Sequence, residues 1–310
     1  MRICLSSDWH LRFKPPEGRV DDFFEVQKGK VDQLIAIAHD HECTAILQAG
    51  DMFDSAEGSN AVLSHYLGEL IFSCPVVFTV CGQHDSYMRN RATGRTALDV
   101  AEATDAVHIL GPKPVKIHPG EDDEVNVYGA SWGEGIPPVC DSSAHNVLVA
   151  HAPVYASPIY PGHEPVGPAA FAAKCEGYDL ILLGDAHTGF FCDDEANNRL
   201  VVSTGCLVRL TRAESDLGNR PHVLIYDTNT RGIKRIDLDI KPAAEVFDLS
   251  DKAADAPDLK TVAELIDSLR RDRTERSSFE ARLETLLESG EVSEFAAEFM
   301  RKALAETEEK

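Results

Sequence analysis

The feature that most constrains this chain is a series of polar residues placed where apolar, strand-like runs end. They are Asp, His and Gln, whose side chains can all ligate a metal ion. In chain order the motifs are Asp8-x-His10, Gly50-Asp51, Gly82-Gln83-His84-Asp85, His151 and Gly184-Asp185-Ala186-His187. Ligands of open α/β sheets bind at the carboxyl ends of strands, so these residues are expected to converge at one sheet edge. Each motif alone arises often by chance, but the five in this order indicate a metal site.

Apolar periodicity predicts a layered α/β core in the first part of the chain. Strands are expected at 2–6, 44–47 and 75–80, and helices at 24–39 and 60–72. Six later strands are expected at 125–129, 146–150, 179–183, 200–203, 222–226 and 232–238. Because no helical pattern separates these later strands, an antiparallel or mixed sheet is predicted for this half.

The composition changes after residue 240, which ends the first domain. Residues 241–257 contain Lys-Pro-Ala-Ala and Ala-Asp-Ala-Pro and are typical of a linker. Residues 258–310 show three helical patterns, with Asp258 as the expected cap of the first. A region of about 50 residues is small for an independent fold, so its apolar faces need the core, each other or a partner.

The bulk composition limits the class of protein. The 310 residues contain no apolar run near the roughly 20 residues that span a bilayer, and no signal peptide, which predicts a cytoplasmic protein. Eight scattered cysteines without a C-x-x-C pair favour free thiols over a disulfide scaffold. The net charge of −22 argues against a basic surface for nucleic acid, although bound cations would add attraction for phosphate.

The ordered motifs resemble the calcineurin-like metallophosphoesterase superfamily over most of residues 1–240. The pattern of that superfamily is D-x-H, G-D, G-N-H-[DE], H and G-H-x-H. The resemblance implies an α/β fold, a two-sheet sandwich flanked by helices, here followed by a C-terminal helical extension. It also implies two divalent metal ions at the strand ends.

Further segments are similar to the SbcD-like DNA-repair exonuclease subunit. Ser7–Leu11 is similar to its opening, Gly50–Asp54 resembles its G-D-L-F-D, and Ser203–Leu210 resembles its Y-P-G-S-L-x-R segment. Pro221–Asp227 matches its next strand in position. This resemblance implies a manganese-dependent DNA exonuclease, with endonuclease activity as an open addition, that works as a homodimer bound to an SbcC-like coiled-coil ATPase. Residues 258–310 are then a candidate docking element for that ATPase, and packing back on the core is the alternative.

The same resemblance assigns a role to each motif residue. One metal would be held by Asp8, His10, Asp51 and His187, and the other by Asp51, Gln83, His151 and Asp185. His84 would stay off the metals and act as general acid for the leaving oxygen. Asp85 would orient the His84 ring, or it is a plain loop carboxylate. Arg209 is a candidate substrate contact, with an ordinary surface arginine as the alternative.

Two residues depart from the superfamily pattern. Gln83 stands where the superfamily has Asn, and Asp185 stands where it usually has His. The added carboxylate makes the second site richer in oxygen, so Mn²⁺ or Mg²⁺ is expected rather than Zn²⁺. The alternative is a weak second site that fills only when substrate is present.

Two other functions stay open. A phosphatase or phosphodiesterase of the same fold could act on a phosphoprotein, a nucleotide or a small phosphodiester, and the acidic balance favours this alternative. A non-enzymatic scaffold that lost a metal site is the third hypothesis, and its only support is Gln83 and Asp185.

Overall fold

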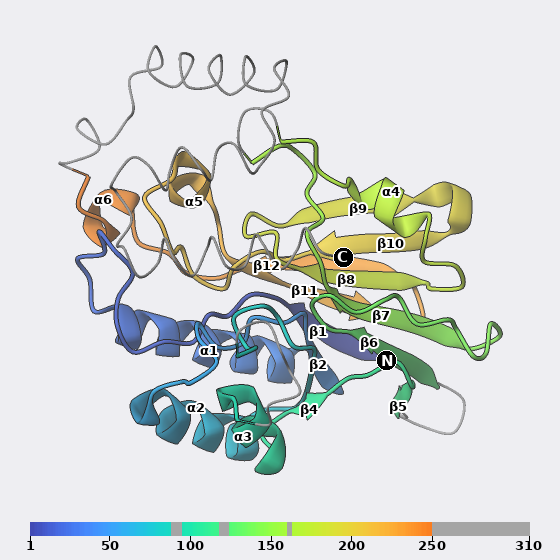
Figure 1. Ribbon diagram of the computed structural model, residues 1–310, viewed down its shortest axis with the longest axis horizontal. Coiled ribbons are helices and arrows are strands. Elements are labelled where there is room, and N and C mark those ends of the chain that lie inside the picture. Colours follow the sequence, from blue (N-terminus) through green and yellow to red (C-terminus); the bar gives the residue numbers. More distant parts are fainter. Residues whose placement is uncertain (88–94, 118–123, 160–162, 250–310) are drawn as a thin grey trace, which may run out of the picture. The chain divides into compact units, whose positions relative to one another are not determined.

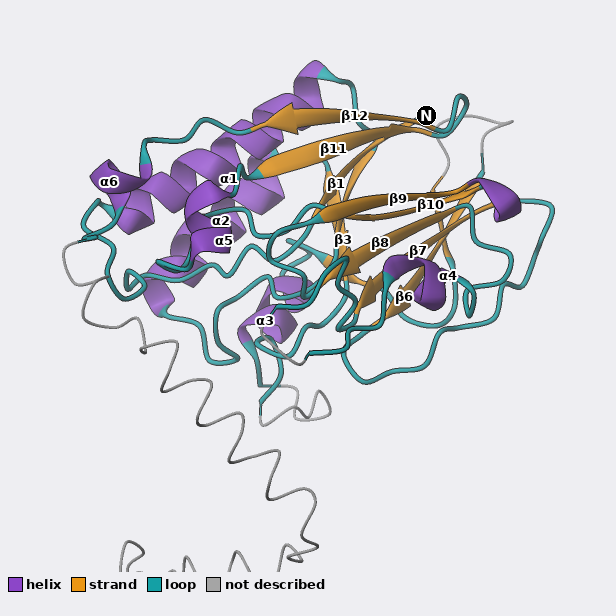
Figure 2. Cartoon of the chain, turned by 90° about the horizontal axis from the view of Figure 1, so that it is seen from above, coloured by secondary structure: helices purple, strands orange, loops and turns teal. Residues whose placement is uncertain are grey.

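The first sheet contains six strands in the order β12-β11-β1-β2-β3-β4. These are β1 (Arg2–Ser6), β2 (Ala45–Gln48), β3 (Val76–Thr79), β4 (His108–Ile109), β11 (His222–Asp227) and β12 (Gly232–Asp237). Strands β1 to β4 run parallel, whereas β11 pairs antiparallel with β1 and β12 with β11. Figure 2 shows β11 and β12 extending this sheet beside β1. The computed structural model describes residues 1–87, 95–117, 124–159 and 163–249.

The second sheet has the strand order β5-β6-β7-β8-β10-β9. These strands are β5 (Val115–Ile117), β6 (Val125–Ala130), β7 (His145–His151), β8 (Leu180–Gly184), β9 (Phe190–Asp194) and β10 (Arg199–Ser203). The four central strands are parallel and the two edge strands are antiparallel. Of the two alternatives predicted for the later strands, antiparallel or mixed, the second sheet is mixed with a parallel centre, whereas 222–226 and 232–238 correspond to β11 and β12 of the first sheet.

Side-chain alternation along the strands builds a layered core. In β1, Ile3 and Leu5 pack between the two sheets, while Cys4 packs on the opposite face. In β7, Val147 and Val149 likewise face the first sheet. Both faces of these strands are buried, which explains why they appear in the sequence as continuous apolar runs. The predicted two-sheet α/β sandwich is confirmed.

Helices cover the outer face of the first sheet. The main ones are α1 (Phe23–Asp40), α2 (Asn60–Ser73) and α3 (Ala97–Ala103), which lie together on one side of the sheets in Figure 1. Apolar residues of these helices share one buried cluster with Cys4 and Ile46. Ser59 caps α2 by accepting from the Val62 N–H, which satisfies one of the free donors at the helix start.

Several short elements carry no periodic signal in the sequence. They are α4 (Pro168–Ala172), α5 (Glu214–Gly218), α6 (Ala243–Val246) and the 3₁₀ helix η2 (Glu195–Asn197), together with α3, β4, β5 and β9. The compact unit runs to Leu249, nine residues past the predicted domain end, because α6 and the buried residues Val246 and Phe247 pack on it. The rest of the predicted linker and the helical region 258–310 lie outside the described residues. Within the described part of the chain, no helix has the length and apolar character needed to cross a bilayer.

Candidate metal centre

The predicted metal ligands follow the carboxyl ends of β1, β2, β3, β7 and β8, and the fold brings these ends together. Ligand atoms of Asp8, Asp51 and His151 lie within 4.8 Å of one another, and so do those of His10, Asp51 and His84. The rings of His10 and His187 are 5.1 Å apart between centroids. Residues from both ends of the motif series therefore form one cluster at the adjoining edges of the two sheets.

The backbone of the cluster is held in an unusual conformation. Asp8, His10, Asp51 and Asp185 have φ values of 48°, 46°, 49° and 86°, a region that non-glycine residues seldom adopt. The two loops after β1 and β2 support each other, because the His10 N–H donates to the Asp51 carbonyl at 2.9 Å. Strain of this kind persists where the surrounding structure fixes it, which is common at functional sites.

Glycines allow the chain segments of the cluster to approach closely. A Cβ atom at Gly82 would lie 2.0 Å from Asp51 Oδ1, and one at Gly184 would lie 1.9 Å from the Ala49 carbonyl oxygen. The His151 Nδ1 is 2.6 Å from the same carbonyl, so Nδ1–H donates and Nε2 points elsewhere. Since only Nε2 remains for a ligand, this hydrogen bond fixes how His151 presents its ring.

The cluster contains buried polar atoms that have no hydrogen-bond partner among the described residues. These atoms are Asp8 Oδ2, His10 Nδ1 and Nε2, Asp51 Oδ2, Gln83 Oε1 and His151 Nε2. Buried polar atoms are normally paired, because leaving them unpaired costs free energy. All belong to predicted ligands, and carboxylate, imidazole and amide atoms are ligand types for divalent cations. The residues present therefore fit the metal ions that the sequence implies.

The charges of the cluster are strongly coupled. Burial raises the pKa of Asp8 and lowers the pKa of His10 to about 3, so the His10 imidazole is neutral. Burial also opposes ionisation of Asp51 and His151, but their attraction over 3.5 Å lowers the pKa of Asp51 to about 2 and raises that of His151 to about 9. Metal ligands must be deprotonated, so His10 is ready to bind a cation, whereas His151 must release a proton.

The two departures from the superfamily pattern contact each other. Gln83 Nε2 donates to Asp185 Oδ1 at 2.7 Å, and the Tyr155 hydroxyl donates to Asp185 Oδ2. The backbone N–H of Asp185 also donates to Asp8 Oδ1 at 3.0 Å. Gln83 and Asp185 are thus a matched pair that lies beside His151, whose Nε2 is 3.9 Å from Asp185 Oδ1. Sequence reasoning missed Tyr155, because nothing in the sequence marks a tyrosine in this loop as a partner of Asp185.

His84 is exposed beside the cluster, with its ring centroid 4.8 Å from that of His10. Its Nδ1 is 2.9 Å from the Asp54 carbonyl oxygen. A carbonyl can only accept, so Nδ1 carries a proton and Nε2 is the nitrogen that remains for substrate. Sequence reasoning also missed this contact of Asp54, although Asp54 belongs to the Gly50–Asp54 motif.

The predicted orienting role of Asp85 is wrong. Its carboxylate accepts from the backbone N–H groups of Met52, Phe53 and Gly82 at 3.2, 2.8 and 3.0 Å, and among the described residues no hydrogen bond joins it to the His84 ring. Asp85 instead ties the loop after β2 to the loop after β3. Burial, reinforced by the charge of Asp51, raises the pKa of Asp85 to about 6.

Arg209 is not a surface arginine. Among the described residues, no hydrogen bond joins it to the cluster either. Its side chain is buried, and its guanidinium donates to the carbonyls of Leu217 and Lys241.

Cys206 lies closer to the cluster, with Sγ within 4.8 Å of ligand atoms of His10 and His187. Burial raises the pKa of the Cys206 thiol.

Comparisons with known proteins give one family and several distant matches among solved structures. The model of the calcineurin-like phosphoesterase family matches residues 1–189. A 5′-nucleotidase precursor from Thermus thermophilus is 12% identical with a TM-score of 0.45, and the match covers 87% of this chain and 59% of that one. A dimetal phosphatase from Danio rerio is 10% identical with a TM-score of 0.45, and the match covers 73% of this chain and 91% of that one. No curated protein sequence matches the chain significantly.

Proposed function

The chain belongs to the calcineurin-like phosphoesterase family, whose members are metal-dependent phosphoester hydrolases. Within this family, we propose that the chain is a manganese-dependent DNA exonuclease of the SbcD-like kind. The observation that carries the hydrolase function is the cluster of buried ligand atoms without partners. The choice of DNA rests on the segments Gly50–Asp54 and Ser203–Leu210, which resemble SbcD-like subunits.

Two sets of residues would hold the metal ions. Asp8, His10, Asp51 and His187 form one set, and Asp51, Gln83, His151 and Asp185 form the other. Bound cations supply polarisation of the phosphate oxygens and a lower pKa for an attacking water. The oxygen-rich second set, with two carboxylates and an amide, favours Mn²⁺ over Zn²⁺.

His84 is suited to protonate the leaving sugar oxygen. Its Nδ1–H donates to the Asp54 carbonyl, which holds the ring and leaves Nε2 of this exposed residue as the acid. Histidine serves this role because its reference pKa is near neutrality. Asp85 supports the acid indirectly, since it holds together the loops that carry Asp51 and His84.

The test compares two substrates with the full chain in the presence of Mn²⁺. Linear double-stranded DNA should be shortened from its ends, and the reaction should stop on chelation. A generic aryl phosphodiester reports whether the metal centre is competent at all. Turnover of the aryl diester together with intact DNA would reject the nuclease function and leave the hydrolase function standing.

A phosphatase or phosphodiesterase acting on a smaller substrate is the second candidate. The net charge of −22 favours it, since a polyanion such as DNA is repelled by an acidic chain. Nucleotides and phosphopeptides added as further substrates in the same assay distinguish it from the nuclease.

The proposed nuclease acts as a homodimer with an SbcC-like coiled-coil ATPase, and residues 258–310 dock that ATPase. Affinity capture of the ATPase by the full chain and by a chain that ends at residue 257 tests this. Equal capture by both would remove the C-terminal region from the role.

A further inference from the structure

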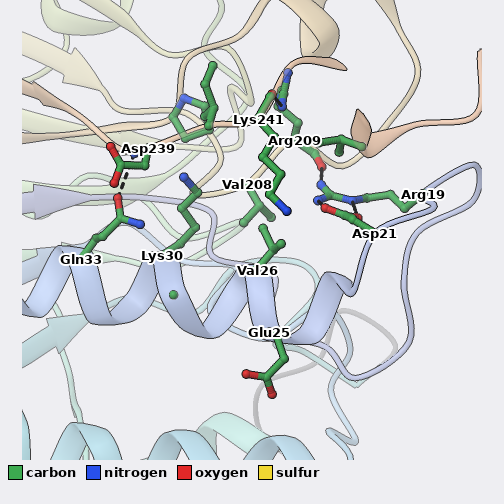
Figure 3. Close-up of a pocket in the computed structure, with 14 residues that line it drawn as sticks. Arg19, Asp21, Glu25, Val26, Lys30, Gln33, Val208, Arg209, Asp239 and Lys241 are labelled. Carbon is green, nitrogen blue, oxygen red and sulfur yellow. Dashed lines mark hydrogen bonds and ion pairs between the residues drawn. The ribbon is translucent and has the colours of Figure 1, made fainter. Parts of the chain in front are cut away.

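A second pocket lies apart from the metal centre, and none of its lining residues is a predicted metal ligand. It has a volume of about 260 Å³ and is formed between α1, the segment before it, and the chain around residues 208, 221 and 239–246. Figure 3 shows Lys30 projecting from α1 into this space, toward the segment with Asp239 and Lys241. Ligand pockets commonly have roughly 300–1,000 Å³, so this one suits a small ligand.

Lys30 is the unusual member of the pocket. It is only 4% exposed, and its Nζ has no hydrogen-bond partner within the part of the chain that the structure describes. An ammonium has three donors and is costly to bury unpaired. Burial accordingly lowers the pKa of Lys30 to about 8, although the charge of Asp239 opposes this. A partner that accepts hydrogen bonds and carries negative charge would remove the cost.

Two of the three acidic residues that line the pocket are already engaged in ion pairs. Asp21 forms an ion pair with Arg19 at 2.6 Å, and Glu25 forms one with Lys28 at 2.9 Å. Figure 3 shows Glu25 directed away from the pocket. Asp239 is therefore the lining acid that faces Lys30 without being engaged in another ion pair. Among the described residues, no ion pair joins Asp239 to Lys30.

The surrounding basic groups make the pocket locally positive. Arg19 is fixed between the rings of Phe23 and Phe247, at 4.8 and 5.1 Å from their centroids. Arg209 is held by two backbone carbonyls and adds its charge. Once the Arg19–Asp21 and Lys28–Glu25 ion pairs are set aside, three basic lining residues and one acidic residue, Asp239, remain, in a chain with a net charge of −22.

We propose that this pocket binds a small oxyanion, a phosphate or carboxylate group, on the ammonium of Lys30. The ammonium donates to the oxyanion, and the charge of Arg209, which also lines the pocket, adds attraction. The apolar side chains of Val26, Val208 and Val246 form part of the wall and limit access of water to the ion pair.

The test measures binding of inorganic phosphate and of acetate to the full chain by calorimetry and by thermal unfolding, with chloride at equal ionic strength as reference. Saturable binding is expected, with a rise in Tm of about 3 °C or more at saturation. The stronger of the two anions identifies the ligand class. Lys30→Met should abolish the effect and should itself be at least as stable, because it removes an unpaired buried charge.

Two further variants make the result specific. Lys28→Met removes a basic residue of the same helix that is paired with Glu25, and it should bind the anions as the unchanged chain does. Asp51→Ala disables the metal centre, which also attracts phosphate, and it should keep the Lys30-dependent binding. Anion binding that survives Lys30→Met and disappears in Asp51→Ala would overturn the proposal. Binding no stronger than that of chloride would also overturn it. Lys30→Gln repeats the test with a polar replacement.

Discussion

His84 is the residue whose function can be separated from metal binding. His84→Ala removes the proposed acid, so kcat should fall about 100-fold or more. Metal content measured on the same sample should stay at the level of the unchanged chain. Because ligand atoms of His84, His10 and Asp51 lie within 4.8 Å, loss of metal would instead identify His84 as a ligand.

Tyr155 holds one oxygen of Asp185 and should affect metal affinity. Tyr155→Phe removes this donor, so Mn²⁺ should bind at one of the two sites about 10-fold more weakly. Calorimetric titration of the metal-free chain checks this. Tyr178→Phe is the matched control, because it removes a hydrogen bond from the segment before β8 to the Pro137 carbonyl in the segment between β6 and β7. Unchanged Mn²⁺ affinity in Tyr155→Phe would show that Asp185 is positioned without the Tyr155 hydroxyl.

For individual residues, the sequence predicts which side chains lie together, but it does not predict the hydrogen bonds that they form. Asp8, His10, Asp51 and His151 follow strand ends, so their convergence follows from topology. Asp85 is adjacent to His84 in the sequence, which predicts a contact with its ring, yet it accepts from three backbone groups. Such contacts depend on loop conformation, which neither spacing nor periodicity encodes.

Strand β8 ends where a side chain has no space. Gly184→Ala would place a Cβ atom 1.9 Å from the Ala49 carbonyl and 2.5 Å from His151 Nδ1. The free energy of unfolding should fall by about 1–3 kcal/mol, as for other overpacked sites. Urea denaturation of the full chain measures the change.

Gly68→Ala provides the control on α2. A Cβ atom there would meet nothing within 4 Å, so this substitution should stabilise the chain by about 0.5–1 kcal/mol through helix propensity alone. Equal effects of the two substitutions would mean that the close approach of β8 to the loop after β2 does not matter for stability.

The long elements are predictable and the short ones are not. Continuous apolar runs predict β1, β7 and β8, because both faces of these strands are buried. By contrast, β4 has two residues and α6 has four, and neither spans enough chain for a periodic pattern. Their formation depends on packing against the finished sandwich.

The whole molecule should gain stability from its metals. Ligands that bind only the folded state raise Tm, and the cluster offers buried polar atoms that no group of residues 1–87, 95–117, 124–159 and 163–249 satisfies. Mn²⁺ added to the metal-free chain should therefore raise Tm measured by calorimetry. In Asp51→Ala, which lacks the proposed bridging ligand, metal content should be lost at both sites and Mn²⁺ should leave Tm unchanged. A Tm gain of normal size in this variant would disprove the bridging role.

The position of β1 has a consequence for synthesis. This strand pairs with Ala45–Gln48 on one side and with Leu224–Asp227 on the other, and Leu207 N–H donates to the Asp8 carbonyl. The partners of the loop that contains Asp8 are therefore synthesised more than 190 residues after it. At 5–20 residues per second, synthesis of that length of chain takes roughly 10–40 s. The catalytic centre therefore matures late, and until then the nascent chain exposes an unpaired edge of β1 that a chaperone would have to shield.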